Sequence, residues 1–182
     1  MKQLLIILMV AFSGISAFAQ LKEIPKQNIP EDYGYIVKVG QALPEIELIL
    51  TDGKKVTSSD LKGKVVMLQF TASWCGVCRK EMPHIESEIW QKHKNNSNFS
   101  LIGVDMDEPV DKVKKFVDDM KITYPLALDP GGKIFYTFAA KGAGVTRNII
   151  VDKTGKIVYM TRLYKENEFN EMKEVIELLL KK

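Results

Sequence analysis

Two closely spaced cysteines are the residues of this chain best suited to chemistry. Cys75 and Cys78 are its only cysteines, and two residues separate them. An apolar run at residues 65–70 leads into the pair, and apolar residues at helical spacing follow it, namely Met82, Ile85, Ile89 and Trp90. The pair is therefore predicted to lie where a buried strand ends and a helix begins.

That position would make the cysteines reactive. A helix N-terminus carries partial positive charge and free N–H groups, which favour the thiolate, the reactive form of cysteine. With two intervening residues in a helical turn, the two sulfurs can also reach each other. The spacing therefore predicts a redox-active dithiol that closes and opens a disulfide, with no metal or organic cofactor.

Three other interpretations of the cysteine pair stay open. A static structural disulfide would stabilise the fold little, because a two-residue loop hardly constrains the unfolded chain. Half of a zinc site would need more ligands, but the chain has no second cysteine pair, and His84 and His93 both follow the motif on the predicted helix. The third interpretation is two unrelated buried thiols.

The residues around the pair resemble a known family. The segment Trp74-Cys75-Gly76-Val77-Cys78 is similar to the active-site motif of the thioredoxin superfamily. Its continuation to Pro83 resembles the TlpA/ResA-like branch, the extracytoplasmic thiol–disulfide oxidoreductases of bacteria, which has AhpC/TSA-like relatives. Further similar segments lie at Gly40–Pro44, Asp60–Val66, Tyr124–Pro125 and Leu128–Asp129. The resemblance covers residue 39 to the C-terminus and implies a disulfide reductase.

The order of predicted elements is also the order that a thioredoxin fold needs. Apolar runs predict core strands at residues 64–70 and 99–105, each followed by a helical pattern. A strand hairpin at residues 148–160 and a final helix from about residue 167 complete the fold. Residues 44–57 predict an earlier hairpin. We therefore expect an α/β thioredoxin fold, a central mixed β-sheet flanked by helices, with an N-terminal hairpin extension.

The N-terminus differs in composition from the rest of the chain. Residues 1–19 contain one charge at Lys2, an apolar run, and the small-residue site Ala17-Phe18-Ala19. This pattern predicts a signal peptide cleaved near Ala19. A retained anchor is the alternative, although the unbroken apolar run is shorter than the roughly 20 residues that a span needs. Residues 20–38 are predicted to form an irregular lead-in and residues 39–182 a thioredoxin-like domain, in a periplasmic or secreted protein.

The composition and net charge of the chain limit which classes of partner are expected. The chain has 182 residues, 46% hydrophobic and 27% charged residues, and a net charge of +3, values typical of one soluble domain. This charge indicates no nucleic-acid partner. The resemblance implies disulfide-bearing exported proteins, such as apocytochromes, as substrates and a membrane electron donor as reductant. We expect a monomer.

The resemblance also assigns roles near the cysteines. Cys75 would attack a partner's disulfide and Cys78 would resolve the mixed disulfide, with Trp74 covering the edge of the pair. Glu81 lies one helical turn after Cys78, where the branch has an active-site acid that shuttles a proton; a solvated surface acid is the other interpretation. Gln69 occupies the place where many thioredoxins carry a buried acid, and we expect a polar core residue there.

One segment departs from the family pattern. Relatives have Gly-Val-Pro-Thr with a cis proline in the loop facing the cysteines, whereas this chain has Gly144-Val145-Thr146-Arg147. A cis bond before a residue other than proline costs about 2.5–4 kcal/mol, so we predict a trans Val145–Thr146 bond. In the resembled family the cis bond presents the preceding residue's backbone to substrate. A trans bond would redirect that substrate-binding edge at Val145 and Thr146, and the Thr146 hydroxyl would lie close to Cys75.

Two other functions on this fold stay open. A peroxiredoxin-like thiol peroxidase is one, because Arg147 resembles an arginine in the corresponding loop. However, the proline and threonine that peroxiredoxins place before their cysteine are missing, and Ala72 lies three residues before Cys75. A copper-delivery protein is the other. It would need a longer cysteine spacing and a distal histidine, and neither His84 nor His93 is distal.

Overall fold

The computed structural model describes residues 23–182, which fold around a seven-stranded sheet in the order β2-β1-β5-β4-β3-β6-β7. The strands β3, β4 and β5 are parallel, while β6 runs antiparallel to β3 and β1 runs antiparallel to β5. The predicted mixed sheet and the N-terminal hairpin, β1 with β2, are therefore confirmed. The strands are β1 (Glu47–Leu50), β2 (Lys55–Thr57), β3 (Val65–Thr71), β4 (Phe99–Met106), β5 (Leu126–Asp129), β6 (Arg147–Val151) and β7 (Ile157–Arg162).

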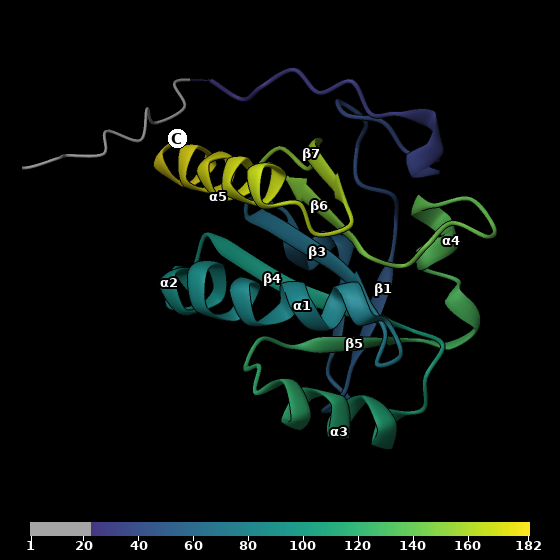
Figure 1. The fold of residues 1–182 in the computed structure, drawn as a ribbon. Helices are drawn as coiled ribbons and strands as arrows, with labels where there is room; N and C mark the ends of the chain where they lie inside the picture. Colours follow the sequence, from purple (N-terminus) through teal and green to yellow (C-terminus); the bar gives the residue numbers. More distant parts are fainter. Residues whose placement is uncertain (1–22) are drawn as a thin grey trace, which may run out of the picture.

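Helices cover both faces of this sheet. They are α1 (Gly76–His84), α2 (Gln91–His93), α3 (Val110–Met120), α4 (Phe135–Phe138) and α5 (Glu166–Lys181), with short 3-10 turns η1 (Glu31–Tyr33), η2 (Ser58–Leu61) and η4 (Pro130–Gly132). Figure 1 shows α1 and α5 side by side over one face, with α3 next to β5. Phe135 of α4 packs on the opposite face, where its ring centroid lies 5.6 Å from that of Phe70. No helix within residues 23–182 is long and apolar enough to cross a membrane.

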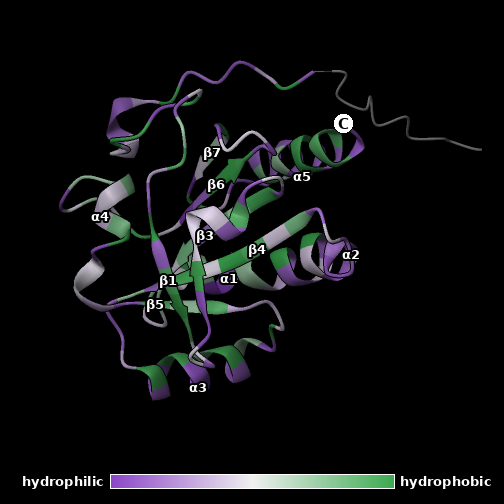
Figure 2. Cartoon of the chain, turned by 180° about the vertical axis from the view of Figure 1, so that it is seen from behind, coloured by the Kyte–Doolittle hydropathy of each residue, from purple (hydrophilic) through white to green (hydrophobic). Residues whose placement is uncertain are grey.

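Strand β3 forms the centre of the core. All seven of its residues are buried, as the apolar run in the sequence predicts for a strand with a neighbour on each side. Side chains alternate between the faces of a strand, so Gln69 and Thr71 face α1 while Phe70 faces α4. The contact between Thr71 Oγ1 and Met82 Sδ of α1, 3.4 Å, marks the first of these faces. Figure 2 shows the central strand β4 as largely hydrophobic, with polar and apolar residues mixed along α3 and α5.

The helix after the cysteines continues beyond α1. A wide π turn, η3 (Ile85–Trp90), follows α1 directly and leads into α2, so the helical spacing seen in the sequence extends to His93. Pro83 lies inside α1. Because proline lacks an N–H group and its ring crowds the carbonyl four residues earlier, wider turns after it accommodate the break in the hydrogen-bond pattern.

The lead-in packs along β7, the last strand of the sheet. The side chain of Gln27 makes two hydrogen bonds with the backbone of Met160, donating to its carbonyl at 3.0 Å and accepting from its N–H at 2.8 Å. Further along, the N–H of Ile157 donates to the Gln41 carbonyl at 2.8 Å. This segment thereby covers polar groups that an edge strand would otherwise expose. The predicted signal peptide lies outside the described residues.

Candidate active site

Cys75 lies at the predicted junction between strand and helix. Strand β3 ends at Thr71, and Cys75 is the N-cap residue of α1. Its Sγ accepts a hydrogen bond from the N–H of Cys78 at 3.1 Å, which uses one of the free donors of the first helical turn. The two cysteines are joined in a disulfide. The N-terminus of α1 therefore donates a hydrogen bond directly to the Cys75 sulfur.

The two cysteines differ in accessibility. Cys75 is 7% exposed and Cys78 is fully buried, whereas the neighbouring Trp74 is 63% exposed. An incoming thiolate or disulfide can therefore reach only Cys75 without rearrangement. The Trp74 side chain is exposed to solvent next to Cys75, in a position where it could contact a partner protein.

Thr146 contacts both sulfurs. The residues described contain no cis peptide bond, so the Val145–Thr146 bond is trans, as predicted. The Oγ1 atom of Thr146 lies 3.1 Å from Sγ of Cys75 and 3.3 Å from Sγ of Cys78. Its carbonyl accepts a hydrogen bond from the N–H of Leu163 at 3.2 Å, which holds the loop in place. A hydroxyl donor thus lies against the disulfide, and the side chain of Val145 beside it is buried.

Glu81 is buried beneath this pair, so the interpretation of Glu81 as a surface acid is wrong. Its side chain is 1% exposed, and Oε1 accepts a hydrogen bond from Nδ2 of Asn148 at 2.7 Å. Burial raises the pKa of Glu81 to about 7, and the amides of Asn148 and Gln69 oppose that rise. At neutral pH this carboxyl can therefore both take up and release a proton.

Two amide side chains flank Glu81. Gln69 of β3 and Asn148 of β6 are direct cross-strand partners, so both side chains face α1. Gln69 is fully buried, as expected of a polar core residue, and its Oε1 accepts a hydrogen bond from the Tyr124 hydroxyl at 2.8 Å. Sequence reasoning missed Asn148 and Tyr124. The alternation of side chains along a strand offers a signal for Asn148, because it lies two residues after Thr146.

A second group of polar residues fixes the turn before the cysteines. The Glu108 carboxylate accepts hydrogen bonds from the backbone N–H and the hydroxyl of Ser73, at 2.5 and 2.7 Å. Arg79 donates to the Ser73 carbonyl at 3.2 Å. Behind them, Asp105 is fully buried, and burial together with the charge of Glu108 raises its pKa to about 8. Ser73 is therefore held on three sides just ahead of Trp74, an arrangement that the sequence did not indicate.

Arg147 lies on the face of the sheet opposite to Thr146. It stacks over the rings of Tyr35 and Phe135, at 4.5 and 5.6 Å from their centroids, and its Nε donates to the Gly144 carbonyl at 3.1 Å. The side chain is fully buried there. Arg147, which the peroxidase interpretation brought in, therefore points away from the cysteine sulfurs.

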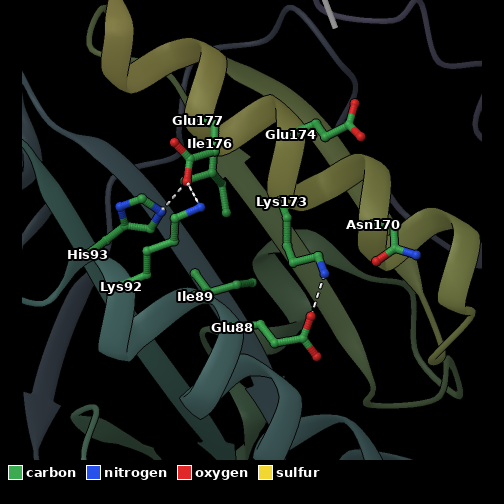
Figure 3. Close-up of a pocket in the computed structure, with 9 residues that line it drawn as sticks. All are labelled: Glu88, Ile89, Lys92, His93, Asn170, Lys173, Glu174, Ile176 and Glu177. Atoms are coloured by element: carbon green, nitrogen blue, oxygen red, sulfur yellow. Dashed lines mark hydrogen bonds and ion pairs between the residues drawn. The ribbon is translucent and has the colours of Figure 1, made fainter. Parts of the chain in front are cut away.

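The two histidines lie on the helix that leads away from the cysteines. His84 pairs with Glu88 at 2.9 Å, and His93 pairs with Glu177 of α5 at 3.1 Å. Figure 3 shows a pocket between η3–α2 and α5 in which Lys173 pairs with Glu88, and Lys92 and His93 pair with Glu177. Residues 23–182 contain no cluster of three or more His, Cys, Asp or Glu side chains that could hold a metal ion.

Known proteins are similar to this chain in sequence. The family model described as Redoxin matches residues 38–176. The thiol–disulfide oxidoreductase ResA of Bacillus thuringiensis subsp. konkukian is 33% identical over 154 residues, which cover 82% of this chain and 83% of that protein. The ResA protein of Bacillus anthracis is 37% identical over 123 residues, covering 67% and 68% of the two chains.

Solved structures agree with these relatives. The solution structure of a candidate protein disulfide isomerase from Bacteroides thetaiotaomicron is 58% identical, with a TM-score of 0.80 over 82% of this chain and 94% of that one. The crystal structure of a candidate thiol:disulfide interchange protein DsbE from Chlorobium tepidum is 25% identical, with a TM-score of 0.66 over 79% and 99% of the chains. The chain therefore belongs to the Redoxin family and is a ResA/TlpA-like thiol–disulfide oxidoreductase of the thioredoxin superfamily.

Proposed function

We propose that this protein is an exported disulfide reductase, whose dithiol form reduces disulfides in other exported proteins. The observation that carries the proposal is the unequal burial of the two cysteines above a titrating acid. Cys75 is the only sulfur open to a partner, while Cys78 and Glu81 are enclosed one helical turn apart. That arrangement suits a nucleophile and a resolving thiol with its own proton acceptor.

In the first step the Cys75 thiolate attacks one sulfur of the partner's disulfide. The partner's S–S bond breaks, a mixed disulfide with Cys75 forms, and the other partner sulfur leaves as a thiolate that takes a proton from solvent. The Cys78 N–H and the Thr146 hydroxyl, both at 3.1 Å, can stabilise the attacking thiolate. Trp74 and the backbone of Val145 would contact the partner.

In the second step Cys78 releases the partner. The Glu81 carboxylate takes the proton of the Cys78 thiol, and the resulting thiolate attacks Sγ of Cys75. The Cys75–Cys78 disulfide forms, and the remaining partner sulfur leaves as a thiolate and is protonated. Two electrons have then passed from the cysteine pair to the partner. A membrane electron donor would return two electrons and two protons to regenerate the dithiol, and apocytochromes are one class of exported substrate.

Export rests on residues 1–19 of the sequence. Their single charge, apolar run and small-residue site support secretion with cleavage near Ala19. The N-terminal sequence of protein recovered from the periplasm or culture medium tests this. A mature chain beginning at Gln20 is expected, and an intact chain in the membrane fraction would instead indicate a retained anchor.

A comparison of substrates tests the proposed activity. The reduced protein is mixed with insulin, with hydrogen peroxide and, separately, with copper ions, and Cys75→Ser serves as the inactive control. We expect insulin reduction by the native protein only, peroxide loss at the rate of the control, and weak copper binding. Fast peroxide consumption with little insulin reduction would favour a thiol peroxidase, and tight copper binding would favour copper delivery.

A further inference from the structure

The Gln69 side chain has a fixed orientation. Tyr124 is buried, and burial raises the pKa of its hydroxyl well above the ordinary value, so this hydroxyl stays protonated and donates a hydrogen bond. It donates to Oε1 of Gln69 at 2.8 Å. An amide group has its acceptor oxygen and its donor nitrogen on opposite sides. With the oxygen committed to Tyr124, the Nε2 group of Gln69 is the side left to face Glu81.

A glycine makes this contact possible. Gly103 of β4 is the cross-strand partner of Gln69 on the side away from Asn148. A Cβ atom built at Gly103 would lie 2.0 Å from Cδ2 of Leu126 and 3.4 Å from the Tyr124 ring. The missing side chain therefore leaves room for Leu126, which packs next to the Tyr124 ring. A Cβ at 103 would collide with Leu126 and touch the Tyr124 ring, so a larger residue there would displace Leu126 beside Tyr124.

Two buried polar atoms, one on Gln69 and one on Glu81, lack hydrogen-bond partners. Within residues 23–182, neither Nε2 of Gln69 nor Oε2 of Glu81 makes a hydrogen bond. The other oxygen of Glu81 is already bonded to Asn148. A donor without an acceptor and a carboxyl oxygen without a donor are each costly in a buried site. Ionisation of Glu81 would make Oε2 a stronger acceptor and so favour a hydrogen bond from Nε2 of Gln69.

We propose that Gln69 is a positioning residue for Glu81: held by Tyr124, it donates an N–H to Oε2 of ionised Glu81 and so sets the pH range over which Glu81 exchanges a proton with Cys78. The proposal rests on the proton-acceptor role of Glu81 proposed above. Gln69 itself is fully buried, and the hydrogen bonds described at the two sulfurs come from Cys78 and Thr146. It acts by making the carboxylate that accepts the Cys78 proton easier to form.

The groups around Glu81 that favour its ionised form are amide side chains. The two influences in the described residues that favour its ionised form are the side chains of Asn148 and Gln69. Within residues 23–182, the ionisable groups that interact with its charge are three tyrosines: Tyr35 from the lead-in, Tyr124 before β5 and Tyr164 after β7. Burial raises the pKa of each tyrosine, so all three are neutral where Glu81 titrates.

The proposal is tested by titrating Glu81 directly. In the oxidised full-length protein, the side-chain carboxyl carbon of glutamate is followed by NMR with carbon-13 labelling as the pH changes. Glu81→Gln identifies the signal. Gln69→Met keeps the length of the side chain and removes the amide, so the pKa of Glu81 is expected to rise by about one pH unit, a tenfold change in proton affinity. Tyr124→Phe frees the amide to rotate and should raise it by a smaller amount.

A matched variant separates this effect from a loss of packing. Tyr159→Phe also removes a buried tyrosine hydroxyl, one that donates to Glu171 at 2.7 Å, and should leave the Glu81 titration unchanged. The inference is overturned if the Glu81 titration in both Gln69→Met and Tyr124→Phe coincides with that of the native protein. If Gln69→Met fails to fold, the comparison of the Glu81 pKa in Tyr124→Phe with that in Tyr159→Phe decides the question alone.

The role of Glu81 is judged separately, by the pH dependence of insulin reduction in Glu81→Gln. If that dependence changes while Gln69→Met leaves the titration unmoved, the proposed function stands and this inference falls. If the titration moves but Glu81→Gln reacts like the native protein, Gln69 does control Glu81, and the proton-acceptor role is what fails.

Discussion

The hydroxyl oxygen of Thr146 lies 3.1 Å from the sulfur of Cys75. The family resemblance implies a cis proline at this position, and proline has no side-chain donor. A trans bond with a β-branched residue instead brings a hydroxyl within hydrogen-bond distance of both cysteines. The departure from the family pattern thus adds a polar group next to the sulfur of Cys75, where the thiolate forms during the reaction.

The first prediction concerns this hydroxyl. Thr146→Val keeps the shape of the side chain and removes the donor, so the reduced protein should lose one hydrogen bond to the Cys75 thiolate. Hydrogen bonds to charged groups contribute about 1.5–3 kcal/mol, so the pKa of the Cys75 thiol should rise by about one unit or more. The rate of alkylation by iodoacetamide as a function of pH measures it. Thr137→Val, whose hydroxyl bonds the Lys133 carbonyl, is the control. Identical profiles for all three proteins would contradict the prediction.

The second prediction concerns the division of labour between the cysteines. Because Cys75 is the more accessible sulfur, Cys78→Ser should accumulate mixed disulfides with partner proteins, and Cys75→Ser should not. Gel electrophoresis of alkylated samples without reductant detects these complexes. Complexes found with Cys75→Ser alone would reverse the assignment of attacking and resolving residues.

The third prediction follows from the buried position of Glu81. Its pKa is about 7 in the folded protein against an ordinary value of 4.5, so the folded state binds more protons than the unfolded state between these values. The contribution of Glu81 to the free energy of unfolding is fully present below about pH 4.5. It is lost as the pH rises from there through 7, a loss of roughly 3 kcal/mol. Glu81→Gln should remove this component of the pH dependence.

Urea unfolding of the oxidised protein at several pH values measures the effect. Glu88→Gln is the control, because the Lys173 side chain lowers the pKa of Glu88 and the sign there is opposite. If the native protein and Glu81→Gln lose stability equally between pH 5 and pH 7, Glu81 is not buried in the way described.

The fourth prediction concerns Asp105, behind the turn that leads to the cysteines. With a folded pKa of about 8, its carboxyl is protonated at neutral pH and loses its proton only in alkaline solution. A negative charge would then face Glu108, which holds Ser73. Hydrogen exchange at the Ser73 amide should therefore speed up above pH 8 beyond its intrinsic rise, and Asp105→Asn should abolish that excess. An unchanged excess in Asp105→Asn would place its cause elsewhere.

Much of this architecture follows from patterns in the sequence. The apolar run of β3 and the helical spacing after it correctly predicted that Cys75 lies at a strand–helix junction. The cost of a cis bond before a non-proline residue correctly predicted a trans bond at Thr146. Both features depend on neighbours in the chain, which is why local reasoning reaches them.

The environment of Glu81 could not be predicted in this way. Its burial depends on which face of α1 meets the sheet, and its partners come from distant strands. Gln69 and Asn148 become neighbours only through the register of β3 with β6, and Tyr124 reaches Gln69 across the glycine of β4. A single sequence contains no direct record of such long-range contacts. The signal peptide, the monomeric state and the absence of a cofactor stay predictions.

The reduction potential of the Cys75–Cys78 couple is the most direct test of the proposal that this pair works as a reductant. It is measured by equilibrating the protein with glutathione or dithiothreitol at fixed ratios of thiol to disulfide and quantifying its oxidised fraction. A buried carboxyl that becomes charged beside the cysteines disfavours their thiolates, so the dithiol should be a strong electron donor. The account predicts a potential near that of thioredoxin, about −270 mV, or lower. A value near −120 mV, typical of a strongly oxidising protein of this fold, would contradict it.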